Sequence, residues 1–322
     1  MRRMTLFTAA VVAAAVLAAA GGCGRLAPAG PPAQADEVAQ IIKAKFPDNG
    51  TNGPPPPLEI QPATGTTNIS GRFVLAGGAE IPVPAAIAVC TPGGRAVPGE
   101  ALLIDARTGG IKNVVVYLFT KNNSIGWSDD VPAPPEATPL PDDLDGKDAA
   151  NQADYDQKFC VFKSHVFPLR LGQTLKIMNS DVFGHNTNIT GYTNVVVPAG
   201  ESVLYKFNAE TSYPIPVSCN IHSYMKSFIL PRENGYLAVT DKEGKFKIKN
   251  VPTGFELDFM VWHESAATSG PEGGRLVLDV DQKKNIKTLR WNTTTKGHFK
   301  IKLDPDTPID FGDIAVPLSA FK

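Results

Sequence analysis

The sequence predicts an all-β protein built from a Greek-key β-sandwich and a smaller C-terminal β-sandwich. Its 322 residues include 29 glycines and 28 prolines, a composition that favours turns and strands over helices. From residue 68 onward, short alternating or β-branched runs recur between Gly, Pro and Asn, as they do in β-sandwiches. A chain of this length accommodates about two domains of roughly 150 residues each.

Residues 1–22 are predicted to be an export signal. Arg2 and Arg3 precede an apolar run over residues 6–20, which is shorter than the ~20 apolar residues of a membrane-spanning helix. The small residues before Cys23 resemble a bacterial lipobox, in which Cys23 would be acylated and would anchor the chain to a membrane. The alternative is ordinary secretion with cleavage nearby. Both alternatives predict a location in the periplasm or cell envelope.

Residues 23–65 are predicted to be a tether, because proline-rich stretches such as "PAGPPAQA" and "NGPPPP" stay extended and bury little surface. The first sandwich is predicted over residues 66–232. It is interrupted at about residues 122–157, where five prolines and nine acids occur with a single lysine. This composition predicts an exposed insertion loop, which either helps to dock a partner or is simply solvated.

A second module is predicted over residues 233–322. The stretch "GYLAVTDKEGKFKIKNVPTGFELDFMVWHE" reads as three strands joined by a polar turn and a "VPTG" turn. Its Asp-x-x-Gly-x-Phe-x-Ile hairpin resembles the carboxypeptidase regulatory and transthyretin-like domains. This resemblance implies a small separate β-sandwich. The alternative is that these strands extend the first sandwich.

The stretch "VSCNIHSYM" places Cys219, His222 and Met225 three residues apart. A copper site for one-electron transfer uses two imidazoles, a thiolate and a weak axial thioether, and this loop supplies three of them. The fourth ligand has to come from another loop. His185, in "LKIMNSDVFGHN", precedes Cys219 by 33 intervening residues and is the candidate. Taken singly, each residue has an ordinary alternative as a surface histidine, a disulfide cysteine or a core methionine.

This order of ligands resembles the cupredoxins, the blue type 1 copper proteins, and in particular their amicyanin- and plastocyanin-like members. Those members carry an Asn, five residues, His-Asn, and later Cys-x2-His-x2-Met. The residues that match the pattern are Asn179, His185, Asn186, Cys219, His222 and Met225. The resemblance covers residues 66–232 and implies a cupredoxin sandwich that holds one type 1 copper.

The resemblance also implies a role for each matching residue. His185, Cys219 and His222 would be the equatorial copper ligands, and Met225 the long axial ligand. Zinc suits the set less well, since structural zinc sites use more thiolates or lack a thioether.

Two asparagines are implied to support the ligands. Asn179 would pin the first ligand loop to the second, in a region that offers hydrogen bonds near the Cys219 sulfur, and Asn186 would be a second supporting residue. An apolar rim around His222 would pass electrons to redox protein partners. The candidates for this rim are Phe183, Ile221 and Tyr224.

The four cysteines divide among these roles. Exported proteins commonly pair their cysteines in disulfides. If Cys23 is acylated and Cys219 is a copper thiolate, Cys90 and Cys160 remain as one disulfide pair. The alternative is that this bridge does not form.

The other histidines and the tryptophans are expected to be structural. His165 is expected to be a strand residue without metal, His263 to be structural in the second module, and His298 to face solvent. Trp262 and Trp291 are expected to fill the core of the second module. No nucleotide-binding glycine loop, nucleophile elbow or His-Glu-x-x-His motif occurs in the sequence, so we expect no enzyme activity.

A formal net charge of −1, without a Lys/Arg cluster, argues against nucleic-acid binding. The sequence therefore predicts an exported, lipid-anchored copper protein that carries one electron between redox protein partners. Two alternatives stay open. One is an extracytoplasmic β-sandwich that serves as a binding or scaffold protein, and the other is periplasmic copper handling by the same ligands.

Overall fold

The structure is a computed structural model. The predicted export signal, Cys23, the predicted tether up to residue 62, Cys90 and residues 120–147 lie outside the residues that it describes. Within the described part, no helix is long and apolar enough to cross a membrane. The described residues are 63–77, 80–83, 86–88, 96–119, 148–149, 152–268, 273–277, 290–292 and 297–321.

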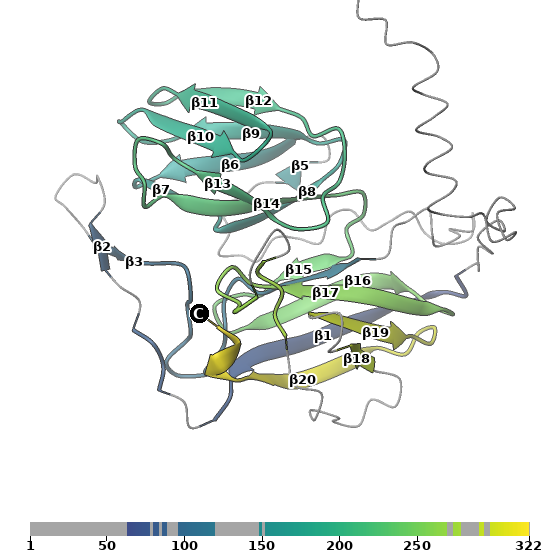
Figure 1. The fold of residues 1–322 in the computed structure, drawn as a ribbon. Helices are drawn as coiled ribbons and strands as arrows, with labels where there is room; N and C mark the ends of the chain where they lie inside the picture. The colour runs from purple at the N-terminus through teal and green to yellow at the C-terminus, as the bar shows by residue number, and fades with distance from the viewer. Residues whose placement is uncertain are drawn as a thin grey trace, which may run out of the picture. The chain divides into compact units, whose positions relative to one another are not determined.

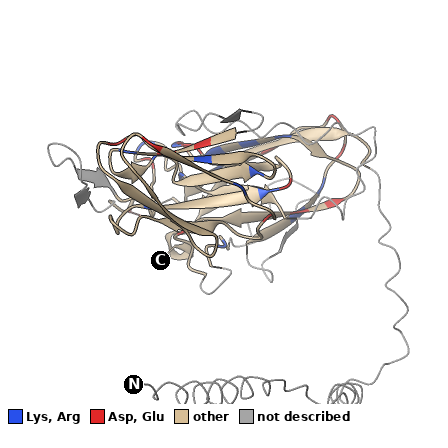
Figure 2. Ribbon diagram, turned by 90° about the horizontal axis from the view of Figure 1, so that it is seen from above, with Lys and Arg blue, Asp and Glu red and all other residues tan. Residues whose placement is uncertain are grey.

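Strands account for nearly all the regular structure of the described residues, which confirms the predicted all-β fold. They form two β-sandwiches (Figure 1) and a separate hairpin between β2 (Ala86–Ala88) and β3 (Ala96–Pro98). One short 3-10 helix, η3 (Leu318–Ala320), lies near the C-terminal end. Basic and acidic residues are interspersed along the strands (Figure 2).

The first sandwich is formed by the strands between residues 148 and 232. One sheet has the order β11-β10-β13-β14-β8 and the other has the order β12-β9-β6-β5, with β7 paired to β6. Neighbours are antiparallel except in the pairs β14–β8 and β6–β9, which are parallel. The strands are β5 (Asp148–Ala149), β6 (Gln152–Lys158), β7 (Val161–Phe162), β8 (Val166–Arg170), β9 (Thr174–Asn179), β10 (His185–Ile189), β11 (Thr193–Val197), β12 (Ser202–Tyr205), β13 (Ile215–Ser218) and β14 (Lys226–Arg232).

Alternation of side chains along these strands builds the core of the first sandwich. Strand β9, "TLKIMN", buries every second residue, because successive side chains of a strand point to opposite faces. Tyr155 of β6 stacks on Phe162 with 5.4 Å between the ring centroids and meets Phe167 edge-on at 5.2 Å. This core supports the ends of the strands from which the candidate ligands project.

The second sandwich consists of a sheet in the order β16-β1-β20 and a sheet in the order β15-β4-β17-β19-β18. A buried apolar cluster that includes Phe73, Phe246 and Phe299 contains residues of both sheets. The strands are β1 (Thr66–Leu75), β4 (Val115–Leu118), β15 (Leu237–Val239), β16 (Lys245–Pro252), β17 (Glu256–Trp262), β18 (Arg290–Asn292), β19 (His298–Lys302) and β20 (Ile309–Val316).

The predicted start of the first sandwich at residue 66 is wrong. Strand β1 pairs with β16 and β20, and β4 pairs with β15 and β17, so both strands belong to the second sandwich. The pairing joins residues far apart in the sequence, since Ile69 lies opposite Ile309. An alternating run such as β1 and a continuous apolar run such as β4 each fit either core, and therefore local patterns could not place these strands.

A third apolar cluster contains residues of both sandwiches. Strand β4 is buried on both faces, which explains why "VVYL" is continuously apolar and not alternating. Next to it, the buried Arg232 donates from Nη2 to the carbonyl of Leu118 at 2.8 Å and lies over the ring of Tyr117. The buried members of this cluster are Val115, Tyr117, Val166, Leu230, Leu237, Val239, Met260 and Trp262.

The predicted insertion ends earlier than residue 157. Strand β6 begins at Gln152 and buries Ala153, Tyr155 and Gln157 in alternation with half-buried residues. Asp154 and Asp156 occupy those alternate positions. Acidic residues are compatible with a strand when they fall on every second position, which composition alone does not reveal.

Candidate metal centre

Three neighbouring strands bring the predicted ligands to one end of the first sandwich. His185 is the first residue of β10, Cys219 directly follows β13, and Met225 directly precedes β14. Because β13 is antiparallel to both β10 and β14, these three strand termini lie at the same end of the sheet. His222 lies on the short loop between β13 and β14.

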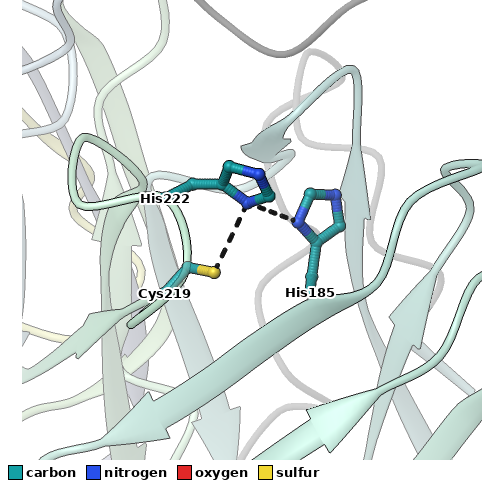
Figure 3. Close-up of side chains that lie close together, drawn as sticks. All are labelled: His185, Cys219 and His222. Carbon is teal, nitrogen blue, oxygen red and sulfur yellow. Dashed lines mark hydrogen bonds between the residues drawn. The ribbon is translucent and has the colours of Figure 1, made fainter.

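The side chains of His185, Cys219 and His222 converge (Figure 3). Nδ1 of His185 lies 3.1 Å from Nδ1 of His222, and Sγ of Cys219 lies 3.7 Å from that same His222 nitrogen. One ligand atom from each of the three residues falls within 4.8 Å of the others. Two imidazole nitrogens and one sulfur at this spacing fit a single metal ion.

The cluster lies at the boundary between core and surface. His185 is 0% exposed and Cys219 is 1% exposed, whereas His222 is half-buried. Burial raises the pKa of Cys219, but hydrogen bonds from His185 and from the backbone N–H groups of Asn186, His222 and Ile221 outweigh it and lower the pKa to about 6. The site therefore favours the thiolate, which is the form that binds a metal.

Met225 is held beside the cluster by the fold of its own loop. The N–H of Cys219 donates to the carbonyl of Met225 at 3.2 Å, and the N–H of Met225 donates to the carbonyl of His222 at 2.9 Å. Met225 is buried and belongs to the same apolar cluster as Cys219. This placement is compatible with an axial thioether, and that role stays a prediction.

The two asparagines divide the supporting role differently from the prediction. Nδ2 of Asn179 donates to the carbonyls of Phe183 at 2.7 Å and Val197 at 2.8 Å, so it ties the first ligand loop to β11. The link to the second ligand loop comes from Asn186. Its Oδ1 accepts the N–H of Asn220 at 3.0 Å, and its own N–H donates to the Cys219 sulfur at 3.3 Å. The pairing of β10 with β13 explains this, because it brings Asn186 beside the start of that loop.

Asp181 is a candidate functional residue that the ligand spacing does not reveal. Its Oδ2 accepts Nε2–H of His185 at 2.8 Å, and its two oxygens also accept the backbone N–H groups of Phe159 and Cys160, each at 2.7 Å. Burial lowers the pKa of His185, but Cys219 and Asp181 outweigh it and raise the pKa overall. The one signal in the sequence is a carboxylate four residues before a candidate histidine ligand.

A second group of possible ligand atoms, on Cys160, Asp181 and His185, does not fit a metal ion. Cys160 is disulfide-bonded, so it offers no thiolate, and Asp181 already accepts N–H groups. Cys219 is the free cysteine of the described residues. The partner of Cys160 lies outside the described residues, so its pairing with Cys90 stays a prediction.

Exposed apolar side chains lie on both ligand loops. Phe183 is 41% exposed and Ile221 is 56% exposed, while Tyr224 is half-buried with its ring centroid 6.0 Å from that of His222. Val182, which was not among the predicted rim residues, is more exposed than any of them. These side chains form an apolar surface next to the half-buried His222.

His165 and His263 are buried, but neither lies in a strand: His165 directly precedes β8 and His263 directly follows β17. Nδ1 of His165 lies 3.1 Å from a carboxylate oxygen of Glu100, and its Nε2 contacts Glu264. His263 donates to the carbonyl of Lys112 at 3.2 Å. Within the described residues, neither histidine belongs to a group of converging metal ligands.

Two expectations about other residues are wrong. His298 is buried, not solvent-facing: its Nδ1 lies 3.0 Å from Asp258, and its ring meets Phe119 edge-on at 4.6 Å. Trp262 belongs to the apolar cluster shared by the two sandwiches and not to the core of the second. The side chain of Trp291 lies outside the described part of the structure.

The donor set fits copper on chemical grounds. A buried thiolate and two imidazoles converge, and a buried thioether residue lies on the same loop. Thiolate and thioether sulfur suit Cu(I), and imidazole suits both copper oxidation states.

No protein-family model and no curated protein matches the chain. Among solved structures, a Cu(I) mutant of amicyanin is 12% identical over 24% of this chain and 80% of its own, with a TM-score of 0.23. An oxidized amicyanin mutant is 13% identical over 27% of this chain and 87% of its own, with a TM-score of 0.24. The copper-containing nitrite reductase of Thermus scotoductus SA-01 is 23% identical over 25% of this chain but 22% of its own, with a TM-score of 0.23. TM-scores this low carry no argument, so the assignment rests on the residues of the site.

Proposed function

We propose that this chain is an exported copper-binding protein that carries one electron at a single type 1 copper between redox protein partners and catalyses no reaction itself. The observation that carries the proposal is the convergence of His185 Nδ1, His222 Nδ1 and Cys219 Sγ at the ends of adjacent strands. Met225, on the same loop and in the same apolar cluster as Cys219, would add a thioether to that set.

The residues of the site would hold the metal rather than activate a substrate. His185, His222 and Cys219 would bind copper through the atoms that already converge, and the copper would accept and release one electron. His185 and Cys219 are anchored at strand ends inside a packed core, which would keep their positions similar in both oxidation states. The N–H of Asn186 donates to the Cys219 sulfur and orients the thiolate.

Electron exchange would take place at His222, the least buried of the three converging ligands. Phe183 and Ile221 give the surface around it an apolar character, which suits brief contact with a redox protein. The exposed aliphatic Val182 extends the same surface.

Copper storage or delivery would use the same ligands, and the burial of the site argues against it. Metal exchange needs access to the ligand atoms, whereas His185 and Cys219 are almost completely covered. Stopped-flow mixing of the Cu(I) form with a copper chelator and with a small redox mediator separates the two functions. A carrier of electrons reduces the mediator much faster than it loses copper.

The proposal also places the protein outside the cytoplasm, attached through an acylated Cys23. Intact-mass measurement of the mature chain from membranes tests this part alone. The mass of a diacylated or triacylated chain that begins at Cys23 supports it, and an unmodified soluble chain rejects the anchor without affecting the copper site.

A redox titration of the copper-loaded full chain tests the main proposal. We expect one copper per chain and a reversible one-electron transition. Cys219→Ala removes the thiolate and should abolish that transition, whereas the neighbouring Ser218→Ala should preserve it. A wild-type chain that binds no copper, or whose bound copper does not cycle between Cu(II) and Cu(I), sinks the proposal.

A further inference from the structure

The turn between β6 and β7 has an unusual conformation for its sequence. Its two residues, Phe159 and Cys160, both have positive φ angles, 59° and 56°. A two-residue hairpin turn of this type ordinarily carries Asn-Gly or Asp-Gly, since a side chain in the left-handed region costs about 1–2 kcal/mol. The cost therefore has to be offset by something outside the turn.

Asp181 supplies the compensating contact. The N–H of Phe159 donates to Oδ1 and the N–H of Cys160 donates to Oδ2, each at 2.7 Å. Consecutive amides that point at one anion form an anion-binding concavity. The turn thus holds the carboxylate of Asp181 in place through two backbone hydrogen bonds.

The same carboxylate faces His185. Nε2 of His185 lies 2.8 Å from Oδ2 of Asp181. A carboxylate accepts hydrogen bonds and cannot donate them, so the proton of the neutral imidazole must sit on Nε2. Once Nδ1 has released the proton that it shares with the Cys219 sulfur, its lone pair faces His222 Nδ1 and that sulfur.

We propose that Asp181 is a positioning residue for the copper: held by the β6–β7 turn, it fixes the copper-binding tautomer of His185 and stabilises Cu(II) over Cu(I). The inference rests on the proposed function, because it concerns the same metal. The side chain of Asp181 is 11% exposed, so water screens its charge only partly. Cu(II) carries one more positive charge than Cu(I) and gains more from that charge.

Affinity measurements on the full chain test this. Asp181→Asn removes the negative charge that contacts His185, and Asp156→Asn is the matched control. Asp156 also accepts a backbone N–H next to Asp181, that of Ser180 at 3.1 Å, and no bond joins it to His185. For Asp181→Asn we expect a loss of Cu(II) affinity of about 10- to 100-fold and a smaller loss of Cu(I) affinity. A tenfold difference between the two losses equals a rise of about 59 mV in the reduction potential.

The outcomes separate the two proposals. Wild-type protein that binds no copper overturns the proposed function and this inference with it. Wild-type protein with a reversible copper couple, in which Asp181→Asn shifts the potential no more than Asp156→Asn, overturns this inference alone. If Asp181→Asn does not fold, ¹⁵N NMR of the metal-free wild type decides. We expect neutral His185 to carry its proton on Nε2, and a proton on Nδ1 contradicts the proposal.

Discussion

His185 and His165 are two buried histidines of the same sandwich, and their surroundings give them opposite tasks. Each has a carboxylate on Nε2: Asp181 at His185 and Glu264 at His165. They differ at Nδ1. The Nδ1 of His165 faces a second carboxylate, Glu100, at 3.1 Å, whereas the Nδ1 of His185 faces another imidazole and a thiolate.

The partner at Nδ1 decides whether a histidine holds a proton or a metal. Burial opposes the charge on His165, but Glu100 and Glu264 outweigh it and raise its pKa to about 9. His165 is therefore a cation at neutral pH, and it links three separate segments of the chain. A single carboxylate at His185 leaves Nδ1 available, so that position can bind copper.

Replacing each histidine in turn with glutamine should separate the two roles most clearly. His185→Gln removes a copper ligand, and we expect it to weaken Cu(II) binding by more than about 100-fold, the upper range for residues that only support a ligand. His165→Gln should leave copper affinity within a few-fold of wild type. Competition titrations with a copper chelator measure both. Equal losses in the two variants contradict the separate roles.

The free energy of unfolding should respond in the opposite way, with the larger loss in His165→Gln. His165→Gln leaves two carboxylates facing each other without a cation, and removing one partner of a buried charge cluster costs about 3–5 kcal/mol. Glu100 is 33% exposed at its side chain, which lowers the expected loss to about 2–3 kcal/mol. Urea unfolding of the metal-free chains measures this loss. His185→Gln should lose less, and a larger loss there would argue against the account.

Raising the pH should dismantle the His165 cluster. Because the pKa of His165 is raised from 6.5 to about 9 on folding, its stabilisation is complete below about pH 6.5 and is lost as the pH rises through about 9. We expect the free energy of unfolding to fall by about 2 kcal/mol between pH 7 and pH 10 from this group. His165→Gln should lack that fall, and the same fall in both chains excludes His165 as its cause.

The smallest expected effect concerns the surface at His222. Ile221→Ser removes an apolar side chain that is 56% exposed on the ligand loop, and Leu204→Ser removes one that is 62% exposed on β12. We expect Ile221→Ser to slow electron self-exchange about tenfold, as a loss of about 1.4 kcal/mol in encounter stability would do. Leu204→Ser should leave the rate unchanged. Line broadening in mixtures of the Cu(I) and Cu(II) forms measures the rate, and equal rates in both variants contradict the docking role.

The ligand set could be predicted from the sequence because its information is local. Cys219, His222 and Met225 share one short loop, and His185 follows an easily recognised strand, so spacing alone brings them into one hypothesis. The structure brings His185, Cys219 and His222 together as that spacing predicts. The all-β class was equally accessible, since short alternating runs fill the chain.

The roles of Asp181 and of the His165 cluster could not be predicted, because they depend on contacts between distant segments. Asp181 is held by backbone amides of a turn more than twenty residues away, and backbone amides leave no trace in a sequence. The Glu100–His165–Glu264 cluster joins segments that only the packed structure brings together. The same holds for the β1–β20 pair, whose strands lie near opposite ends of the described chain.

The visible absorption and EPR spectra of the Cu(II)-loaded full chain test the central claim most directly. If Cys219 and the two histidines bind copper, thiolate-to-copper charge transfer gives an intense visible band, and EPR shows one copper site with the narrow hyperfine splitting of a thiolate-bound ion. Both features should disappear in Cys219→Ser. A colourless wild type, or a spectrum that Cys219→Ser leaves unchanged, contradicts the account.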